Sequence, residues 1–143
     1  MMFSTVAVGT DGSATAAEAV RVATDLARRF DAELVLLGAS QESKERAPRR
    51  AQADPELQWA VSPSARAREI VARAQREAQR QGISCRTLID DGDPADVLVR
   101  LAGECDADLL VIGNKGMKRR VLGSVPNTVT HKAPCSVFVV KTT

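Results

Sequence analysis

Four residues in the last third of the chain have the types and spacing of an anion-binding loop. Two residues separate Gly113 from Gly116, and after six further residues Gly123 and Ser124 open a predicted short helix. Glycine lets a backbone approach a phosphate closely and adopt positive φ. The first turn of a helix adds unpaired N–H groups and the positive end of its dipole. The pattern predicts a phosphate site, and the alternative is that the glycines serve turns while Ser124 only caps the helix.

Basic side chains cluster in the same loop. Lys115, Lys118, Arg119 and Arg120 lie between or beside the glycines. Cations at this position would attract a phosphate electrostatically, although a solvated basic loop is the alternative interpretation. Because they gather at the predicted anion site, we expect functional contacts from this group, with Lys118 and Arg119 as the candidates.

The elements that position this loop follow from the spacing of apolar residues. Apolar residues at helical spacing predict four helices between the strands, and the charged, proline-containing residues 41–62 predict a mobile loop. Asp90 and Asp91 are expected in a turn. Short apolar runs predict five strands, at residues 5–9, 34–38, 85–89, 109–113 and 136–140.

Local signals also predict where two helices begin. Thr15 with Glu18 three residues later is the pattern of a capping box, so the first helix is expected to start there. Asp93 is a favourable N-cap, and Pro94 suits the first turn of the third helix.

Strict alternation of strands and helices predicts an α/β fold. We expect a Rossmann-like open five-stranded parallel sheet with four helices on two faces. The runs 6–8 and 109–112 are the most continuously apolar, which is typical of central strands, so these strands are placed side by side. The resulting order is 3-2-1-4-5. Ligands of such sheets bind beyond the carboxyl ends of the strands where the order reverses, and residues 9–12 and 113–116 meet there.

Length and composition narrow the classes of function. The 143 residues are enough for one domain, which we expect to span 1–143. Twenty basic and 18 acidic side chains give a net charge of +2, and only four residues are aromatic, so a nucleic-acid partner is not expected. No apolar run is long enough for a membrane span, and no signal-peptide pattern is present. Three widely spaced cysteines indicate reduced thiols, so we expect a cytoplasmic protein without a membrane partner.

Two long segments resemble the universal stress proteins. The segment 6–13 (VAVGTDGS) resembles their first strand and turn, and the segment 106–140 resembles their closing strand, loop, helix and strand. The family's ATP-binding pattern is glycine, two residues, glycine, nine residues, glycine, then serine or threonine. The corresponding positions in this sequence are Gly113, Gly116, Gly123 and Ser124. The second interval is three residues shorter here, so which nucleotide is bound stays open.

The resemblance implies a regulatory protein that binds an adenine nucleotide. ATP, with or without Mg²⁺, is the expected ligand, and cyclic AMP is the alternative because relatives with the string Gly-Ser-Val-Pro are thought to bind it. Thr10 and Asp11 would line the adenosine side, with Asp11 on the ribose, the base or a metal ion; turn formation is its alternative role. The full expected site is Thr10, Asp11, Gly38, Ala39, Gly113, Gly116, Lys118, Arg119, Gly123, Ser124 and Val125.

The last predicted strand suggests a second copy of the chain as a partner. It is apolar and lies at an edge of the predicted sheet, where unpaired backbone groups favour association. The family resemblance implies that this edge forms a homodimer. The residues concerned are Val137, Phe138, Val139 and Val140.

Two other functions compete with nucleotide binding. A slow ATP hydrolase would need a positioned water and a base, and only Asp11 is suitably placed, so no enzymatic activity is expected beyond a weak incidental one. A phosphorylatable receiver domain would use Asp11 and Asp90, but it needs an acidic pair after the first strand and a lysine in the pocket, whereas Lys141 is almost terminal.

Overall fold

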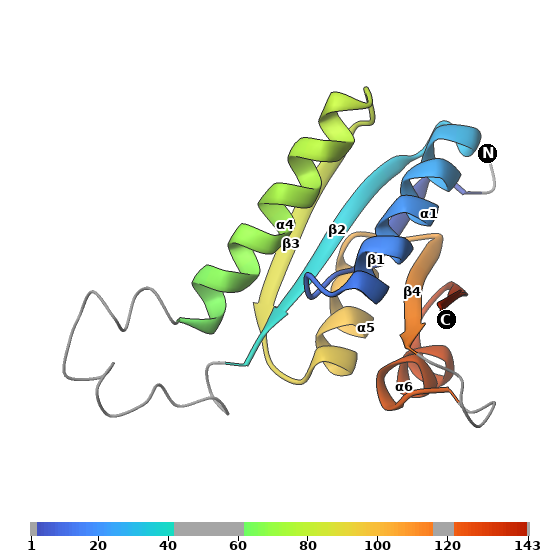
Figure 1. Cartoon of the computed structure of the whole chain (residues 1–143). Helices are drawn as coiled ribbons and strands as arrows, with labels where there is room; N and C mark the ends of the chain where they lie inside the picture. The colour runs from blue at the N-terminus through green and yellow to red at the C-terminus, as the bar shows by residue number, and fades with distance from the viewer. Residues whose placement is uncertain (1–2, 42–61, 116–121, 143) are drawn as a thin grey trace.

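The computed structural model describes residues 3–41, 62–115 and 122–142 (Figure 1). The predicted mobile loop at 41–62, apart from its two end residues, lies outside these ranges, as do Gly116, Lys118 and Arg119. The elements are β1 (Thr5–Gly9), α1 (Ala14–Phe30), β2 (Glu33–Ser40), α4 (Pro63–Arg80), β3 (Cys85–Asp91), α5 (Pro94–Glu104), β4 (Leu109–Lys115), α6 (Ser124–Lys132) and β5 (Ser136–Thr142).

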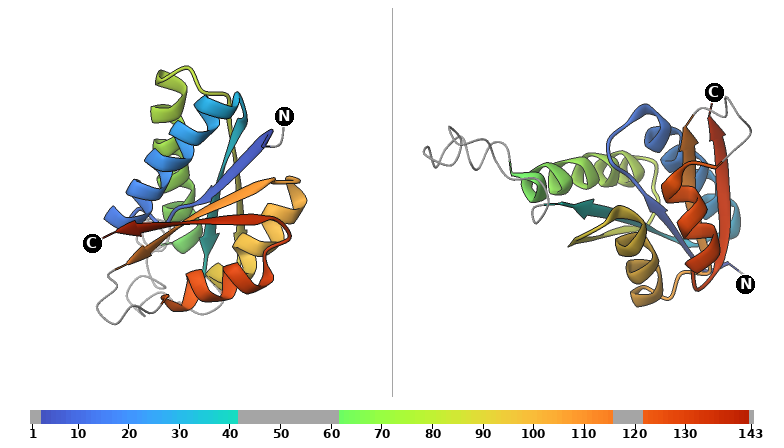
Figure 2. Two further views of the ribbon diagram at one scale, coloured as in Figure 1. Left: turned by 90° about the vertical axis from the view of Figure 1, so that its right-hand side faces the viewer. Right: turned by 90° about the horizontal axis from the view of Figure 1, so that it is seen from below.

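The five strands form one parallel sheet in the order β3-β2-β1-β4-β5, as predicted. In its middle, Val8 of β1 pairs with Leu36 of β2 on one side and with Val111 of β4 on the other. Helices α1 and α4 cover one face and α5 and α6 the other (Figure 2). The predicted α/β class, strand order and two-sided helical cover are therefore confirmed.

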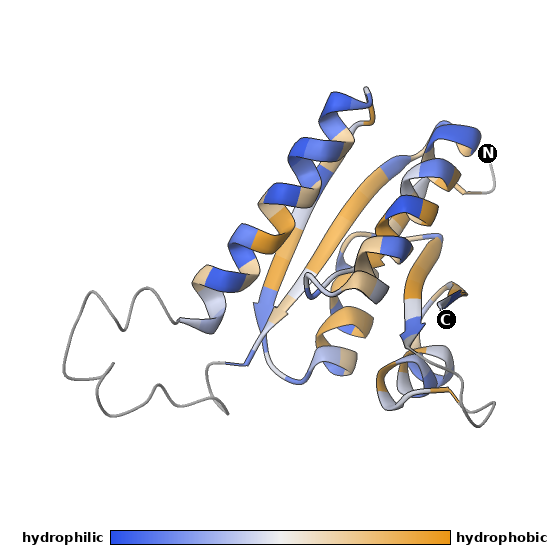
Figure 3. Cartoon of the chain, in the orientation of Figure 1, coloured by the Kyte–Doolittle hydropathy of each residue, from blue (hydrophilic) through white to orange (hydrophobic). Residues whose placement is uncertain are grey.

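The core explains why the central strands read as continuous apolar runs. Successive residues of a strand point to opposite faces, and here both faces are covered. Leu34 and Leu36 thus pack under α1 and α4, while Val35 and Leu37 pack under α5 and α6, and all four are fully buried. Figure 3 shows the consequence, with hydrophobic strands behind helices α1 and α4, whose visible faces are largely hydrophilic.

The start of α1 differs from the prediction. The N-cap is Ser13, whose Oγ accepts the N–H of Ala16 at 3.1 Å. Thr15 lies inside the first turn, so the capping box of Thr15 and Glu18 is wrong. Both patterns are locally possible, and the serine wins because the chain leaves the β1 turn in the extended conformation that an N-cap requires. The predicted N-cap at Asp93 is confirmed.

The turn expected at Asp90 and Asp91 is wrong as well, because β3 continues through both residues to pair with Ala39 and Ser40. Their side chains are satisfied by partners in the sheet and in α5. Asp90 accepts the N–H of Asp91 at 2.8 Å and pairs with Arg100 at 2.7 Å, and the hydroxyl of Ser40 lies 3.2 Å from Asp91. Asp90 therefore sits two strands away from β1, outside the arrangement that a receiver domain would need.

Candidate functional site

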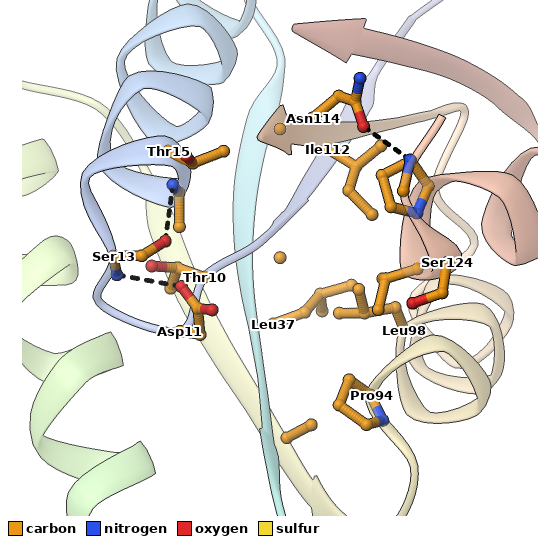
Figure 4. A pocket seen from close by; sticks show the side chains of 17 residues that line it. Thr10, Asp11, Ser13, Thr15, Leu37, Pro94, Leu98, Ile112, Asn114 and Ser124 are labelled. Atoms are coloured by element: carbon orange, nitrogen blue, oxygen red, sulfur yellow. Dashed lines mark hydrogen bonds between the residues drawn. The ribbon is translucent and has the colours of Figure 1, made fainter. Parts of the chain in front are cut away.

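A cavity of about 390 Å³ opens at the carboxyl ends of β1 and β4 (Figure 4). It lies at the point where the strand order reverses, which is where such sheets bind ligands. Helices α1, α5 and α6 all begin at its border, with Ser13, Pro94 and Ser124 among the lining residues. Three helix N-termini, each the positive end of a helix dipole, therefore face one cavity.

The turn after β1 forms one wall and is held by its own polar groups. The N–H of Thr10 donates to the carbonyl of Leu37 at 3.0 Å, which ties the turn to β2. One carboxylate oxygen of Asp11 accepts the N–H of Ser13 at 2.9 Å. Asp11 therefore helps to form the turn, and this role uses only one of its two carboxylate oxygens. The second oxygen has no hydrogen bond within the described residues, and Asp11 lines the cavity.

The start of α6 forms the opposite wall. Gly123 is the N-cap and makes no side-chain cap, so Ser124 is the first residue inside the helix and the alternative role of Ser124 as N-cap is wrong. Pro126, the third helical residue, has no N–H. The N–H groups of Ser124 and Val125, together with the exposed Ser124 hydroxyl, are left without acceptors in the described part of the chain. These three donors are what an anion would meet.

Gly113 lines the cavity, and a packing contact is one reason why this position requires glycine. Its φ lies outside the left-handed region, so positive φ is not what requires glycine here. A Cβ atom would instead lie 2.8 Å from the carbonyl oxygen of Thr15. The first turn of α1 packs directly on the β4 backbone, and only glycine leaves room for it.

Asn114 is a member of the site that the sequence analysis did not identify. It lines the cavity and is fully buried, and its Oδ1 accepts the N–H of Gly123 at 2.9 Å (Figure 4). Its Nδ2 has no hydrogen-bond partner among the described residues. A signal existed, because Asn114 continues the alternation of Leu110 and Ile112, which point to the α5 and α6 face of the sheet. A polar residue at an inward position of a buried strand is typical of a functional or network role.

The residues expected on the adenine side lie only in part on the cavity. Ala39 lines the cavity, together with apolar side chains that were not predicted, namely Leu37, Leu98 and Ile112. Gly38 does not line it. A Cβ there would point toward α4, 3.0 Å from Cγ1 of Val71, because successive residues of β2 face opposite sides of the sheet.

A second, smaller cavity of about 280 Å³ adjoins the first. Thr10, Asp11 and Ala39 border both, and Arg66 of α4 lines the second. The basic candidates Lys118 and Arg119 and the glycine at 116 fall outside the described residues. Asp11 is the one ionisable residue among the described residues that line the first cavity.

The β5 edge carries an exposed aromatic ring. Phe138 is 42% exposed, which is the largest exposure of a big apolar side chain in the described ranges. Val137 and Val139 are half-buried on the opposite face. Val140 differs from these residues, because it is buried in the core. The surface that this edge offers a partner therefore centres on Phe138.

Nearly the whole chain is similar to one protein family and to solved structures. The sequence profile of the universal stress protein family matches residues 2–141. Universal stress protein Rv1636 of Mycobacterium tuberculosis (strain H37Rv) is 38% identical over 147 residues, covering 99% of this chain and 98% of the relative. A universal stress protein solved in complex with cAMP is 32% identical, with a TM-score of 0.75 and complete coverage of both chains. Another, from Archaeoglobus fulgidus in complex with dAMP, shares the fold at 23% identity, a TM-score of 0.70 and 99% and 100% coverage.

Within the described ranges, no helix is both long and apolar enough to cross a membrane.

Proposed function

The chain belongs to the universal stress protein family, and from this premise we propose that it is a regulatory protein that binds an adenine nucleotide in the cavity at the ends of β1 and β4. The observation that carries the proposal is the division of this one cavity into two ends. Free N–H and hydroxyl donors lie at the α6 end, and the apolar side chains of Leu37 and Ala39 lie on β2. A nucleotide has the same polarity, with a phosphate at one end and a base at the other.

ATP is the ligand that we propose first, on the basis of the glycine and serine pattern. Cyclic AMP is the second candidate, and the complex of the 32% identical relative favours it. The described donors also suit a small anion, because Pro126 limits the first turn of α6 to two free N–H groups.

Asp11 would contact the ribose or a Mg²⁺ ion that accompanies ATP. Its unpaired carboxylate oxygen fits either role, since Mg²⁺ is usually bound by one or two carboxylates together with substrate phosphates. No cluster of three or more metal-ligating side chains occurs in residues 3–41, 62–115 and 122–142. The phosphates themselves would therefore supply part of the coordination.

We further propose that the protein binds its nucleotide without turning it over rapidly. Hydrolysis needs a base and a second group that stabilises the developing charge. Asp11 would have to act as the base while one of its oxygens holds the turn. A homodimer through β5, in the cytoplasm, completes the proposal. The exposed Phe138 supports the first part and the three unbridged cysteines support the second.

Calorimetric titration of nucleotide-stripped protein tests the proposal. Mg-ATP, cyclic AMP, AMP and guanosine monophosphate are titrated separately, and saturable one-to-one binding of at least one adenine nucleotide is expected. An Asp11→Asn variant is expected to bind more weakly, while Asp25→Asn on the outer face of α1 serves as the control. Failure of all the adenine nucleotides to bind at millimolar concentration would refute the proposal.

A further inference from the structure

Asn114 is an unexpected residue at its position. It is fully buried at the end of β4, on the same face as Leu110 and Ile112. The Gly123 N–H bond fixes the orientation of its carboxamide, since only the oxygen can accept it. The nitrogen is then a buried donor without an acceptor in residues 3–41, 62–115 and 122–142. Such groups are rare because burying an unpaired donor is costly.

The fold does not need this hydrogen bond to satisfy Gly123. Gly123 is exposed, so water could accept its N–H if Asn114 were apolar. An apolar side chain of similar size would also remove the unpaired Nδ2. Considered for stability alone, leucine would serve as well as asparagine at this position. The costly residue is therefore better explained by what it does to its partner.

The partner is the N-cap of α6. The hydrogen bond between Asn114 and Gly123 joins the two ends of the segment that contains residues 116–121. The backbone of Asn114 is itself fixed, because the hydroxyl of Thr142 donates to its carbonyl at 2.8 Å. Gly123 is thus attached to a rigid point of the sheet. The next two residues, Ser124 and Val125, carry the free N–H groups of the cavity.

We propose that Asn114 is the positioning residue of the phosphate end of this site. Its buried carboxamide holds Gly123 so that the N–H groups of Ser124 and Val125 stay aimed at one phosphate group of the ligand. The inference rests on the proposed nucleotide binding. It adds Asn114 to the proposed site, as a residue that contacts the phosphate-binding turn and makes the site prefer phosphorylated over unphosphorylated ligands. Preorganised donors bind an anion more tightly than donors that must be ordered during binding.

The first test uses Asn114→Leu, with Asn127→Leu on the exposed side of α6 as the matched control. Cyclic AMP, AMP and adenosine are titrated calorimetrically, and thermal unfolding is measured on the same samples. The Asn114→Leu variant is expected to lose about tenfold in affinity for the two nucleotides. Its affinity for adenosine and its Tm are expected to stay at or above the wild-type values. The control is expected to match the wild type throughout.

The second test uses Asn114→Asp, which keeps an acceptor for Gly123 but adds a negative charge beside the phosphate. Affinity for cyclic AMP is compared with the wild type from pH 8 to pH 5, because the phosphodiester stays singly charged over this range. The deficit is expected to be large at pH 8 and to shrink as the introduced carboxyl protonates, since burial raises the pKa of a carboxyl group. This variant also covers the case in which Asn114→Leu does not fold.

The outcomes separate the two proposals. If wild-type protein binds none of the nucleotides, the proposed function fails. If the wild type binds but Asn114→Leu binds cyclic AMP and AMP equally well, the inference about Asn114 is overturned. Equal losses for adenosine and the nucleotides, together with a lower Tm, would also overturn it, because they would indicate a merely structural role. A pH-independent deficit in Asn114→Asp would do the same.

Discussion

Gly113 at the end of β4 lies against Thr15 in the first turn of α1, so closely that a Cβ atom at position 113 would fall 2.8 Å from both the carbonyl oxygen and the Cγ2 of Thr15. One of these contacts is with backbone, which cannot rotate away. Glycine at this position thus allows the start of α1 to pack on the sheet beside the cavity. The same residue is therefore needed for packing and lines the cavity.

Gly113→Ala is accordingly expected to act first on stability. Overpacking against the Thr15 carbonyl should lower the free energy of unfolding by about 1–3 kcal/mol. Gly103→Ala is the matched control, because that glycine lies in α5 with its nearest neighbour, Pro134, 3.8 Å away. Helix propensity should make the control about 0.5–1 kcal/mol more stable. Urea unfolding of both variants checks this, and a Gly113→Ala protein as stable as the wild type would contradict the packing argument.

Two serines at helix starts are expected to behave oppositely. Ser13 caps α1 through its hydroxyl, so Ser13→Ala should cost about 1 kcal/mol of stability. The hydroxyl of Ser124 caps nothing, so Ser124→Ala should change stability by less than about 0.5 kcal/mol. If the hydroxyl binds phosphate as proposed, Ser124→Ala should instead weaken nucleotide binding several-fold. Urea unfolding and calorimetric titration of both variants separate the two roles. A Ser124→Ala protein that is less stable than the wild type would show that the Ser124 hydroxyl stabilises the helix after all.

The order of the strands was predictable because a strand that is buried on both faces has apolar residues at successive positions. Residues 6–8 and 109–112 are apolar without alternation, which is typical of central strands in a covered parallel sheet. The placement of the cavity followed from the strand order. Local chemistry was less decisive. Ser13 and Thr15 are both good caps, and the backbone entering from β1 decides between them.

Contacts between distant residues account for what was missed. The requirement for glycine at 113 comes from Thr15, which is nearly a hundred residues away, and no local rule links them. The role of Asn114 depends on where the N-cap of α6 docks. Gly38 was expected at the adenine edge from the family resemblance, but its side of β2 faces α4, because adjacent residues of one strand face opposite sides of the sheet.

The thiol of Cys85 is expected to react slowly in the folded protein. Burial, and secondly the charge of Glu33, raise the pKa of Cys85 to about 11. Only the thiolate attacks an alkylating reagent, so labelling by iodoacetamide at pH 8 should be slow and should accelerate as the pH approaches that value. Mass spectrometry of the Cys85 peptide, with urea-unfolded protein as the control, measures this. Equal labelling rates in the folded and unfolded protein at pH 8 would show that the thiol is not protected.

Asp108 is expected to make stability depend on pH in the acid range. Its carboxylate accepts the N–H of Thr5 at 2.9 Å, and the N–H and hydroxyl of Ser4 at 2.9 and 3.0 Å. These bonds, the one from Thr5 first, hold the pKa of Asp108 below its usual value. A lowered pKa in the folded state stabilises the protein above the unfolded-state pKa of about 3.9, and this contribution is lost as the pH falls further.

The comparison of wild type with Asp108→Asn isolates this contribution. The difference in unfolding free energy between the two proteins should be constant from about pH 7 to pH 5 and should shrink below about pH 4. Asp25→Asn on the outer face of α1 provides a control, because the Asp25 carboxylate pairs with the exposed Arg29 and accepts no backbone N–H within the described residues. A difference that stays constant down to pH 2.5 would show that the bonds to Ser4 and Thr5 do not favour the ionised form.

Phe138 is expected to decide whether the chain is a dimer. Its ring is 42% exposed on the edge strand β5, while its neighbour Val140 is buried in the core. Phe138→Asp should therefore leave the fold intact and place a charge in the proposed interface, which costs several kilocalories per mole if two copies must bury it.

Analytical ultracentrifugation at micromolar concentration should give a dimer for the wild type and a monomer for the variant. Thr130→Asp, on the exposed side of α6, should remain dimeric. A wild-type protein that sediments as a monomer would refute the β5 dimer, and a dimeric Phe138→Asp variant would move the interface to another surface.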